Sequence, residues 1–142
     1  MAAAYYLDTN VLIALIEPTG PLTERQADFV AKLDHGEASA VASEVALAEC
    51  LVKPLSDLNT KAIEAYQALF SKPSTLIAMP VTRNILISAA TLRAVTRLRL
   101  PDAIHLATAQ EAGCTAFVTN DPDFLSVAGM QIVRWSDLNP AP

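Results

Sequence analysis

The sequence predicts an α/β domain with a mainly parallel sheet of about five strands. Short apolar runs that suit strands alternate along the chain with longer segments of helical periodicity, which is the pattern of successive β-α-β units. The 142 residues are enough for one compact domain, and 52% of them are apolar, which excludes a disordered chain. No internal repeat, linker or low-complexity segment divides the chain, so we expect a single domain over residues 1–142.

The five predicted strands are short segments rich in apolar, aromatic and β-branched residues. They cover residues 5–7, 39–42, 75–79, 116–119 and 131–135. Turn formers bound them, since Pro73-Ser74 breaks the chain before the third strand and Asn120-Asp121-Pro122 follows the fourth. The last seven residues are predicted to form a polar tail.

The predicted helices lie between these strands and are delimited by capping residues and helix breakers. Asn10, Thr23 and Ser43 can cap the first three helices, while Gly36 closes the second and Pro54 ends the third. The six helices cover residues 10–16, 23–36, 43–52, the segment from 60 to the break at 73, 82–98 and 101–113. Apolar residues recur at helical spacing within these segments.

Charge and hydropathy exclude several classes of protein. A net charge of −5 makes the chain a poor non-specific binder of nucleic acid, which argues against a simple basic-patch module. The longest aliphatic run, Val11–Ile16, is far shorter than the roughly 20 residues that span a bilayer, and no basic segment of a signal peptide precedes it. Because Cys50 and Cys114 are isolated in apolar surroundings, we expect a cytoplasmic protein with reduced thiols.

Four of the fifteen acidic residues stand where ordinary surface charges do not. Asp8 follows the first strand, Asp121 follows the fourth, Asp102 opens the helix that leads to the fourth, and Glu49 is the only charge within Val45–Val52. Purely structural uses stay open at this point. Asp8 or Asp121 could cap a turn or a helix, and Asp102 could complement a helix dipole.

The placement of the four acids nevertheless favours a shared site. Ligands of parallel sheets collect at the carboxyl ends of the strands near a topological switch point, and Asp8 and Asp121 follow two such ends. Four carboxylates repel one another unless a cation joins them, and oxygen ligands select a hard ion such as Mg²⁺ or Mn²⁺. His105 lies on the same helical face as Asp102 and could be a ligand, a proton shuttle or a neighbour hydrogen-bonded to the site; we favour the last.

These segments resemble the PIN domain. The matching stretches are LDTNVLI at 7–13, a lone Glu49 in a helix led by Ser43, LPDAIHLATA at 100–109 and FVTNDPDF at 117–124. Their order and spacing are similar to those of the short bacterial and archaeal VapC-type toxins of toxin–antitoxin pairs, over essentially the whole chain. The resemblance implies a PIN-like three-layer fold with helices on both faces of the sheet.

The resemblance also implies roles for individual residues. The family's acidic quartet, which binds Mg²⁺ or Mn²⁺ and is catalytic, is matched by Asp8, Glu49, Asp102 and Asp121. Asn10 and Thr119 match the polar residues behind the quartet, and Asp123 matches an additional acid near it. Ala46 stands where many relatives carry Ser or Thr, which puts one hydrogen bond of the site in doubt.

The expected activity is therefore that of a metal-dependent endoribonuclease, in which metal-activated water attacks an RNA phosphodiester. The resemblance points to tRNA as a common target, to a cognate antitoxin as partner and to a homodimer. Arg93, Arg97 and Arg99 belong to a segment, residues 83–99, that holds four of the ten basic residues and no acid. They could hold the RNA backbone, form a solvated helix face or meet the antitoxin.

Two other functions stay open. A non-catalytic PIN-fold module that binds RNA or protein would usually have lost one or more of the four acids. Another Mg²⁺-dependent phosphate hydrolase, of the aspartyl-phosphate type, would want a second Asp two residues after Asp8, where Asn10 stands, and a lysine in the site.

Overall fold

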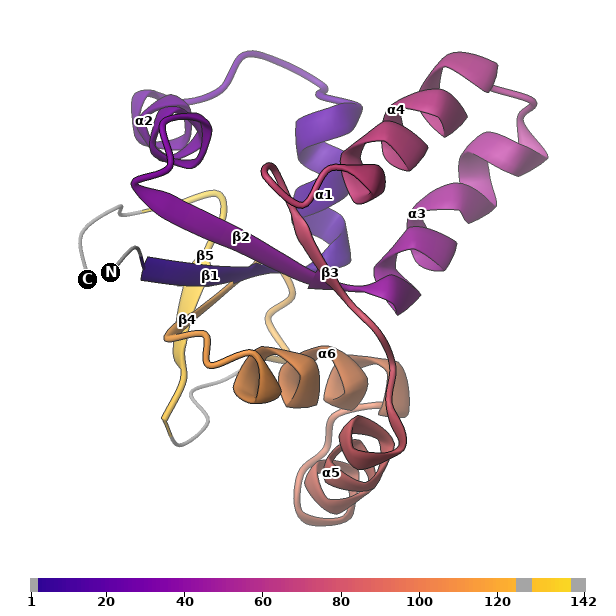
Figure 1. Cartoon of the computed structure of the whole chain (residues 1–142), viewed down its shortest axis with the longest axis vertical. Helices are drawn as coiled ribbons and strands as arrows, with labels where there is room; N and C mark the ends of the chain where they lie inside the picture. The colour runs from indigo at the N-terminus through magenta and orange to yellow at the C-terminus, as the bar shows by residue number, and fades with distance from the viewer. Residues whose placement is uncertain (1–2, 125–128, 139–142) are drawn as a thin grey trace.

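A sheet of five parallel strands forms the middle layer of the molecule, whose computed structural model describes residues 3–124 and 129–138 (Figure 1). The strands are β1 (Ala3–Leu7), β2 (Ala38–Ser43), β3 (Ile77–Met79), β4 (Ala116–Thr119) and β5 (Gln131–Arg134). Their order across the sheet is β3-β2-β1-β4-β5, and every neighbouring pair is parallel. The predicted parallel α/β class is confirmed.

Helices cover both faces of this sheet, as the resemblance implied. Those of the described residues are α1 (Thr9–Ile16), α2 (Glu24–Asp34), α3 (Glu44–Ser56), α4 (Thr60–Ser71), α5 (Arg83–Val95) and α6 (Leu100–Glu111). The first four lie on one side of the sheet, and α5 and α6 lie on the other (Figure 1). No helix in the described ranges is long and apolar enough to cross a membrane.

Each central strand divides its side chains between two hydrophobic cores. Leu7 and Val118 belong to the core under α1–α4, whereas Tyr6 and Phe117 belong to the core under α5 and α6. Alternate residues of a strand face opposite sides, so short and almost uniformly apolar strands fit a sheet that is buried on both faces. Both predicted core thiols are free and buried; burial is the main cause that raises the pKa of Cys50 to about 12 and of Cys114 to about 11.

The order of the strands creates a topological switch point between β1 and β4. The chain passes from β1 to β2 and β3 on one side, and then returns to place β4 on the other side of β1. Leu7 pairs with Val118 in register, so these two strands end side by side. Residues that follow β1 and β4 therefore meet at the same edge of the sheet.

The first helix begins earlier than predicted, and its cap is Asp8 instead of Asn10. The backbone of Asp8 is extended, its side chain accepts a hydrogen bond from the Thr9 N–H at 2.9 Å, and its carbonyl accepts from Val11 N at 3.0 Å. A carboxylate suits this position because it faces the free N–H groups of the first turn. The amide of Asn10 is thereby released for contacts with its neighbours.

Two other helix ends were predicted wrongly. The third helix does not stop before Pro54 but continues to Ser56, because the buried proline ring lies in the last turn, where the missing N–H removes only one hydrogen bond. The fifth helix ends at Val95, since Thr96 adopts an extended backbone and its hydroxyl bonds back to the Leu92 carbonyl at 2.7 Å. A capping side chain of this kind competes with further helix growth.

The predicted polar tail is also partly wrong. Leu138 is only 1% exposed and packs into the core under α1–α4. The rest of the predicted tail from residue 139 onward lies outside the described residues.

Candidate active site

Asp8 occupies the edge of the sheet at the switch point. It follows β1 directly and is only 5% exposed. Its second carboxylate oxygen accepts hydrogen bonds from the Thr119 hydroxyl at 2.7 Å and from the Asn10 amide at 3.1 Å, in addition to the cap bond from Thr9 N–H. A buried carboxylate needs such donors, and here they come from the ends of both central strands.

The segment after β4 is tied to the same place by backbone donors. The N–H of Asp121 bonds to the Thr119 hydroxyl at 3.0 Å, and the N–H of Asn120 bonds to the Asn10 side-chain oxygen at 3.1 Å. The structure thus places both Asn10 and Thr119 in contact with the Asp8 carboxylate. Asp123 contributes its N–H to the Asp121 carboxylate at 2.9 Å.

Asp102 completes a group of three aspartates. It lies in the first turn of α6, and its carboxylate is 3.6 Å from the Arg99 guanidinium. Burial raises its pKa, the charges of Asp121 and Asp8 raise it further, and Arg99 opposes them only in part. The carboxylates of Asp121 and Asp8 are therefore close enough to disfavour the ionised form of Asp102.

Glu49 of α3 lies at the exposed edge of the site. Its side chain is 37% exposed, and it bonds to His105 Nε2 at 2.6 Å and to the Thr9 hydroxyl at 2.8 Å. Burial alone would raise the pKa of Glu49, but the contacts with His105 and Thr9 outweigh it and lower the pKa. Both partners of Glu49 are distant in the sequence, His105 by 56 positions and Thr9 by 40.

His105 is the buried link between Glu49 and the core. It is 1% exposed, and its Nε2 lies 3.9 Å from an Asp8 oxygen. Its Nδ1 lies 2.5 Å from the Tyr6 hydroxyl, which also accepts the Ser43 N–H at 3.1 Å. The favoured interpretation, a histidine hydrogen-bonded to the site, agrees with these contacts.

Sequence reasoning missed two residues of this network, Tyr6 and Thr9. Tyr6 lies within an apolar strand, where a tyrosine is expected as a core residue, and nothing local indicates that its hydroxyl reaches a histidine 99 positions away. Thr9 stands in the LDTN stretch, so its place beside Asp8 was a usable signal. Its bond to Glu49 could not be foreseen.

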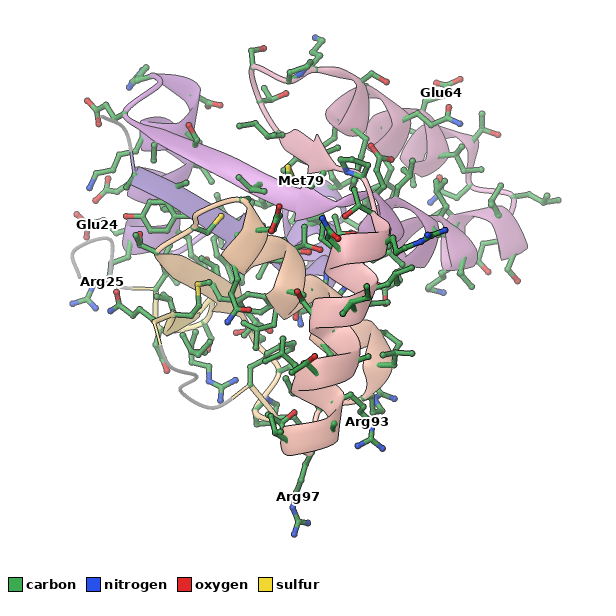
Figure 2. The ribbon with its side chains drawn as sticks, turned by 60° about the horizontal axis from the view of Figure 1, so that its bottom comes forward. Glu24, Arg25, Glu64, Met79, Arg93 and Arg97 are labelled. Atoms are coloured by element: carbon green, nitrogen blue, oxygen red, sulfur yellow. The ribbon has the colours of Figure 1, made fainter. Side chains whose placement is uncertain are left out.

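The three arginines occupy different environments. Arg99 stands at the start of α6 beside Asp102 with its side chain 81% exposed. Arg93 lies in the last turn of α5 and Arg97 just beyond its end, and the side chains of both are exposed and point away from the sheet (Figure 2). The structure therefore brings only Arg99 into the acidic group.

A cavity of about 440 Å³ is lined by Asn10 of α1 and by Asn120, which follows β4. Its wall combines the exposed apolar side chains of Ile13 and Leu22 with the amide of Asn120 and the backbone and side chain around Trp135. Asn120 is held in place, because its side-chain oxygen accepts the Ser136 N–H at 3.0 Å.

The chemistry of the three aspartates fits a divalent cation. Within residues 3–124 and 129–138, no three His, Cys, Asp or Glu side chains are already arranged to hold one ion. The donors at the switch point are nonetheless carboxylate oxygens, the ligands that Mg²⁺ and Mn²⁺ prefer. Burial is the main cause of the raised pKa of Asp102, and the charges of Asp121 and Asp8 add to it; a bound cation would relieve this repulsion.

Comparison with known proteins gives a family match and a set of similar folds. The chain matches the PIN domain model over residues 5–130. A toxin–antitoxin complex from Klebsiella pneumoniae contains a similar chain with 27% identity and a TM-score of 0.64, covering 91% of this chain and 95% of that one. No curated protein matches the sequence.

Two further solved structures share the fold at lower identity. VapBC2 from Rickettsia felis, bound to a DNA fragment from its promoter, has a TM-score of 0.71 at 17% identity, covering 93% of this chain and 98% of that one. VapC20 from Mycobacterium tuberculosis, a sarcin–ricin loop cleaving toxin, has a TM-score of 0.61 at 14% identity, covering 80% and 86%.

Proposed function

Because this chain belongs to the PIN domain family, we propose that it is a metal-dependent endoribonuclease and the toxin of a toxin–antitoxin pair. The observation that carries the proposal is the meeting of Asp8, Asp102 and Asp121 at the switch point, with Asp102 disfavoured as an anion. Acidic side chains whose charges conflict in this way are typical of functional sites. The family match and the toxin structures support the same activity.

The ion, Mg²⁺ or Mn²⁺, would be held by Asp8, Asp102, Asp121 and Glu49. When bound, such an ion would lower the pKa of a water molecule that it coordinates and would stabilise negative charge on the phosphate oxygens. The protein's own contribution is to fix the carboxylates: Thr119, Asn10 and the first turn of α1 hold Asp8.

The RNA would approach across the exposed edge of this group. Arg99 is placed to contact a phosphate beside Asp102, and the cavity next to Asn10 has room for the neighbouring nucleotide. Arg93 and Arg97 would reach the RNA backbone only at a distance from the site. The substrate class is single-stranded or structured RNA, with tRNA as a candidate.

The partner we propose is a cognate antitoxin that places a basic side chain, such as an arginine, against the acidic group. The same repulsion that favours a cation favours an arginine there. Antitoxin binding that survives in the Asp102→Asn and Asp121→Asn variants would contradict this placement. We also propose a homodimer, on the resemblance alone.

The activity is tested by incubating the purified chain with tRNA and ribosomal RNA in the presence of Mn²⁺. Asp8→Asn and Asp102→Asn should each lower the rate of cleavage by more than about 100-fold, since loss of groups behind a metal ligand already costs about 10–100-fold. Asp28→Asn, a change at an exposed position of α2, is the matched control and should cleave like the wild type.

Two outcomes would contradict the proposal. Cleavage that persists in both site variants would show that the acidic group is not the active site. A wild-type chain that binds Mn²⁺ but cleaves none of the RNAs would favour a non-catalytic binding module.

A further inference from the structure

We propose that Tyr6 is a positioning residue of this site: its buried hydroxyl fixes the tautomer and the ring orientation of His105, which in turn holds Glu49. The consequence for metal binding and RNA cleavage rests on the proposed function. The assignment of the His105 tautomer does not rest on it, so the tautomer assignment and the proposed function can be refuted independently.

The ring of Tyr6 is held rigidly in the core. It is fully buried, and it stacks on Phe117 with centroids 4.9 Å apart and planes inclined by 12°. The ring of His105 meets it edge-on at 5.8 Å. Because packing determines the ring position, the place of the hydroxyl is determined as well.

The hydrogen bonds at this hydroxyl determine where its proton points. The Ser43 N–H donates to the oxygen at 3.1 Å, so one lone pair is already used. Burial, with a smaller contribution from the charge of Asp8, raises the pKa of Tyr6 well above its usual value, so the phenol keeps its proton. Among the described residues the acceptor within reach of that proton is His105 Nδ1, at 2.5 Å.

A nitrogen that accepts this hydrogen bond carries no proton of its own. The neutral imidazole of His105 must then carry its proton on Nε2. That nitrogen lies 2.6 Å from the Glu49 carboxylate, which is the acceptor such an N–H requires. The opposite tautomer would put two donors on the Tyr6 oxygen and a lone pair of Nε2 against a carboxylate, so it is disfavoured at both ends.

The chain of contacts joins five elements of the fold. It runs from Ser43 at the end of β2 through Tyr6 of β1 and His105 of α6 to Glu49 of α3, with Thr9 of α1 donating to the same carboxylate at 2.8 Å. The Glu49 side chain is long and partly exposed, so without His105 it would sample several rotamers. The buried tyrosine therefore limits the motion of a carboxylate that it does not touch.

The tautomer is tested by nitrogen NMR of the ¹⁵N-labelled chain in EDTA. The chain has two histidines, and His35 is exposed, so the buried ring is readily assigned. The wild type should show an unprotonated Nδ1 and a protonated Nε2 for His105, and Tyr6→Phe should give exchange between tautomers. A wild-type ring protonated on Nδ1, or averaged like His35, would overturn the proposal.

The consequence for the site is tested by Mn²⁺ affinity and RNA cleavage. Tyr6→Phe should weaken Mn²⁺ binding by about 10–100-fold, as loss of a group behind a metal ligand does, and should lower kcat. Tyr5→Phe, in the same strand but packed against Phe29 on the opposite face, is the control and should change neither. Unchanged Mn²⁺ affinity in Tyr6→Phe would overturn this part of the proposal.

A second variant separates positioning from loss of folding. His105→Gln places an amide N–H donor near Glu49, and this amide, unlike an imidazole, has no tautomers. If Tyr6 acts through His105, adding Tyr6→Phe to His105→Gln should cost much less Mn²⁺ affinity than it does in the wild type. Equal costs in both backgrounds would show that Tyr6 supports only the core. A wild type that shows the expected tautomer but cleaves no RNA would refute the proposed function and leave this assignment intact.

Discussion

Asp102 and Glu49 are two carboxylates of one site, yet their surroundings act on them in opposite directions. The pKa of Asp102 is raised by burial and by the charges of Asp121 and Asp8, whereas the contacts with His105 and Thr9 lower that of Glu49 despite its burial. Asp102 has the exposed Arg99 at 3.6 Å as its positive neighbour, while Glu49 receives two short hydrogen bonds.

The difference separates a carboxylate whose ionised form is disfavoured from one whose ionised form is stabilised by hydrogen bonds. Around Asp102 the negative charges of Asp121 and Asp8 are only partly compensated by Arg99. This repulsion lowers the stability of the fold and favours the binding of a cation. On the Glu49 side, hydrogen bonds link the Tyr6 hydroxyl, both ring nitrogens of His105 and one oxygen of Glu49. Proteins accept unfavourable electrostatics where function needs it and compensate for it elsewhere in the structure.

The largest expected effect is that of Mn²⁺ on stability. A ligand that binds only the folded chain stabilises it by about 2.7 kcal/mol at 100 times its Kd, so Mn²⁺ should clearly raise the Tm of the wild type in calorimetry. The Mn²⁺-induced rise in Tm should be mostly abolished in Asp102→Asn and should be larger in Glu49→Gln than in Asp102→Asn. Asp28→Asn serves as the control, and an undiminished rise in Asp102→Asn would contradict the comparison.

Without metal, the two carboxylates should show stability effects of opposite sign. Glu49→Gln should lower the free energy of unfolding by about 1 kcal/mol, which is below the roughly 1.5–3 kcal/mol of a hydrogen bond to a charged group because the side chain is partly exposed. Asp102→Asn should raise it by less than about 1 kcal/mol, since it removes a charge that its neighbours disfavour. Urea unfolding in EDTA measures the free energy of unfolding of both variants. A lower free energy of unfolding for Asp102→Asn than for the wild type would contradict the prediction for Asp102.

The pH dependence of these two differences follows from the direction of each pKa. Glu49 has a pKa below its ordinary 4.5, so its stabilisation is complete above pH 4.5 and is lost as the pH falls through the lowered pKa. Asp102 has a pKa above its ordinary 3.8, so its penalty is present at neutral pH and disappears as the pH falls through the raised pKa towards 3.8. On acidification the gain from Asp102→Asn should therefore fade first.

Much of the fold could be predicted because its signals are local. Apolar runs, caps and breakers lie next to each other in the sequence, so all five strands and six helices of the described residues were expected near their observed places. The edge where Asp8 and Asp121 meet followed from the rule for parallel sheets. The errors at Asn10, Pro54 and Thr96 arose where a side chain or a packing contact outweighed local preference.

The hydrogen-bonded part of the site could not be predicted in the same way. The contact of His105 with Glu49 spans 56 positions and its contact with Tyr6 spans 99, and a single sequence carries no signal for such pairs. The exposure of Glu49 was also hidden, because a helix flanked by apolar residues can still turn one side chain to solvent. The roles of the site residues stay predictions until variants are measured.

The direct pairing of β1 with β4 also determines when, during synthesis of the chain, the surroundings of Asp8 are completed. Asp8 and its partner Thr119 are 111 positions apart, so the first leaves the ribosome long before the second. Until β4 has been synthesised and has docked beside β1, Asp8 has neither Thr119 nor Asp121 next to it. The acidic group at the switch point is therefore complete only late in synthesis, when β4 has paired with β1.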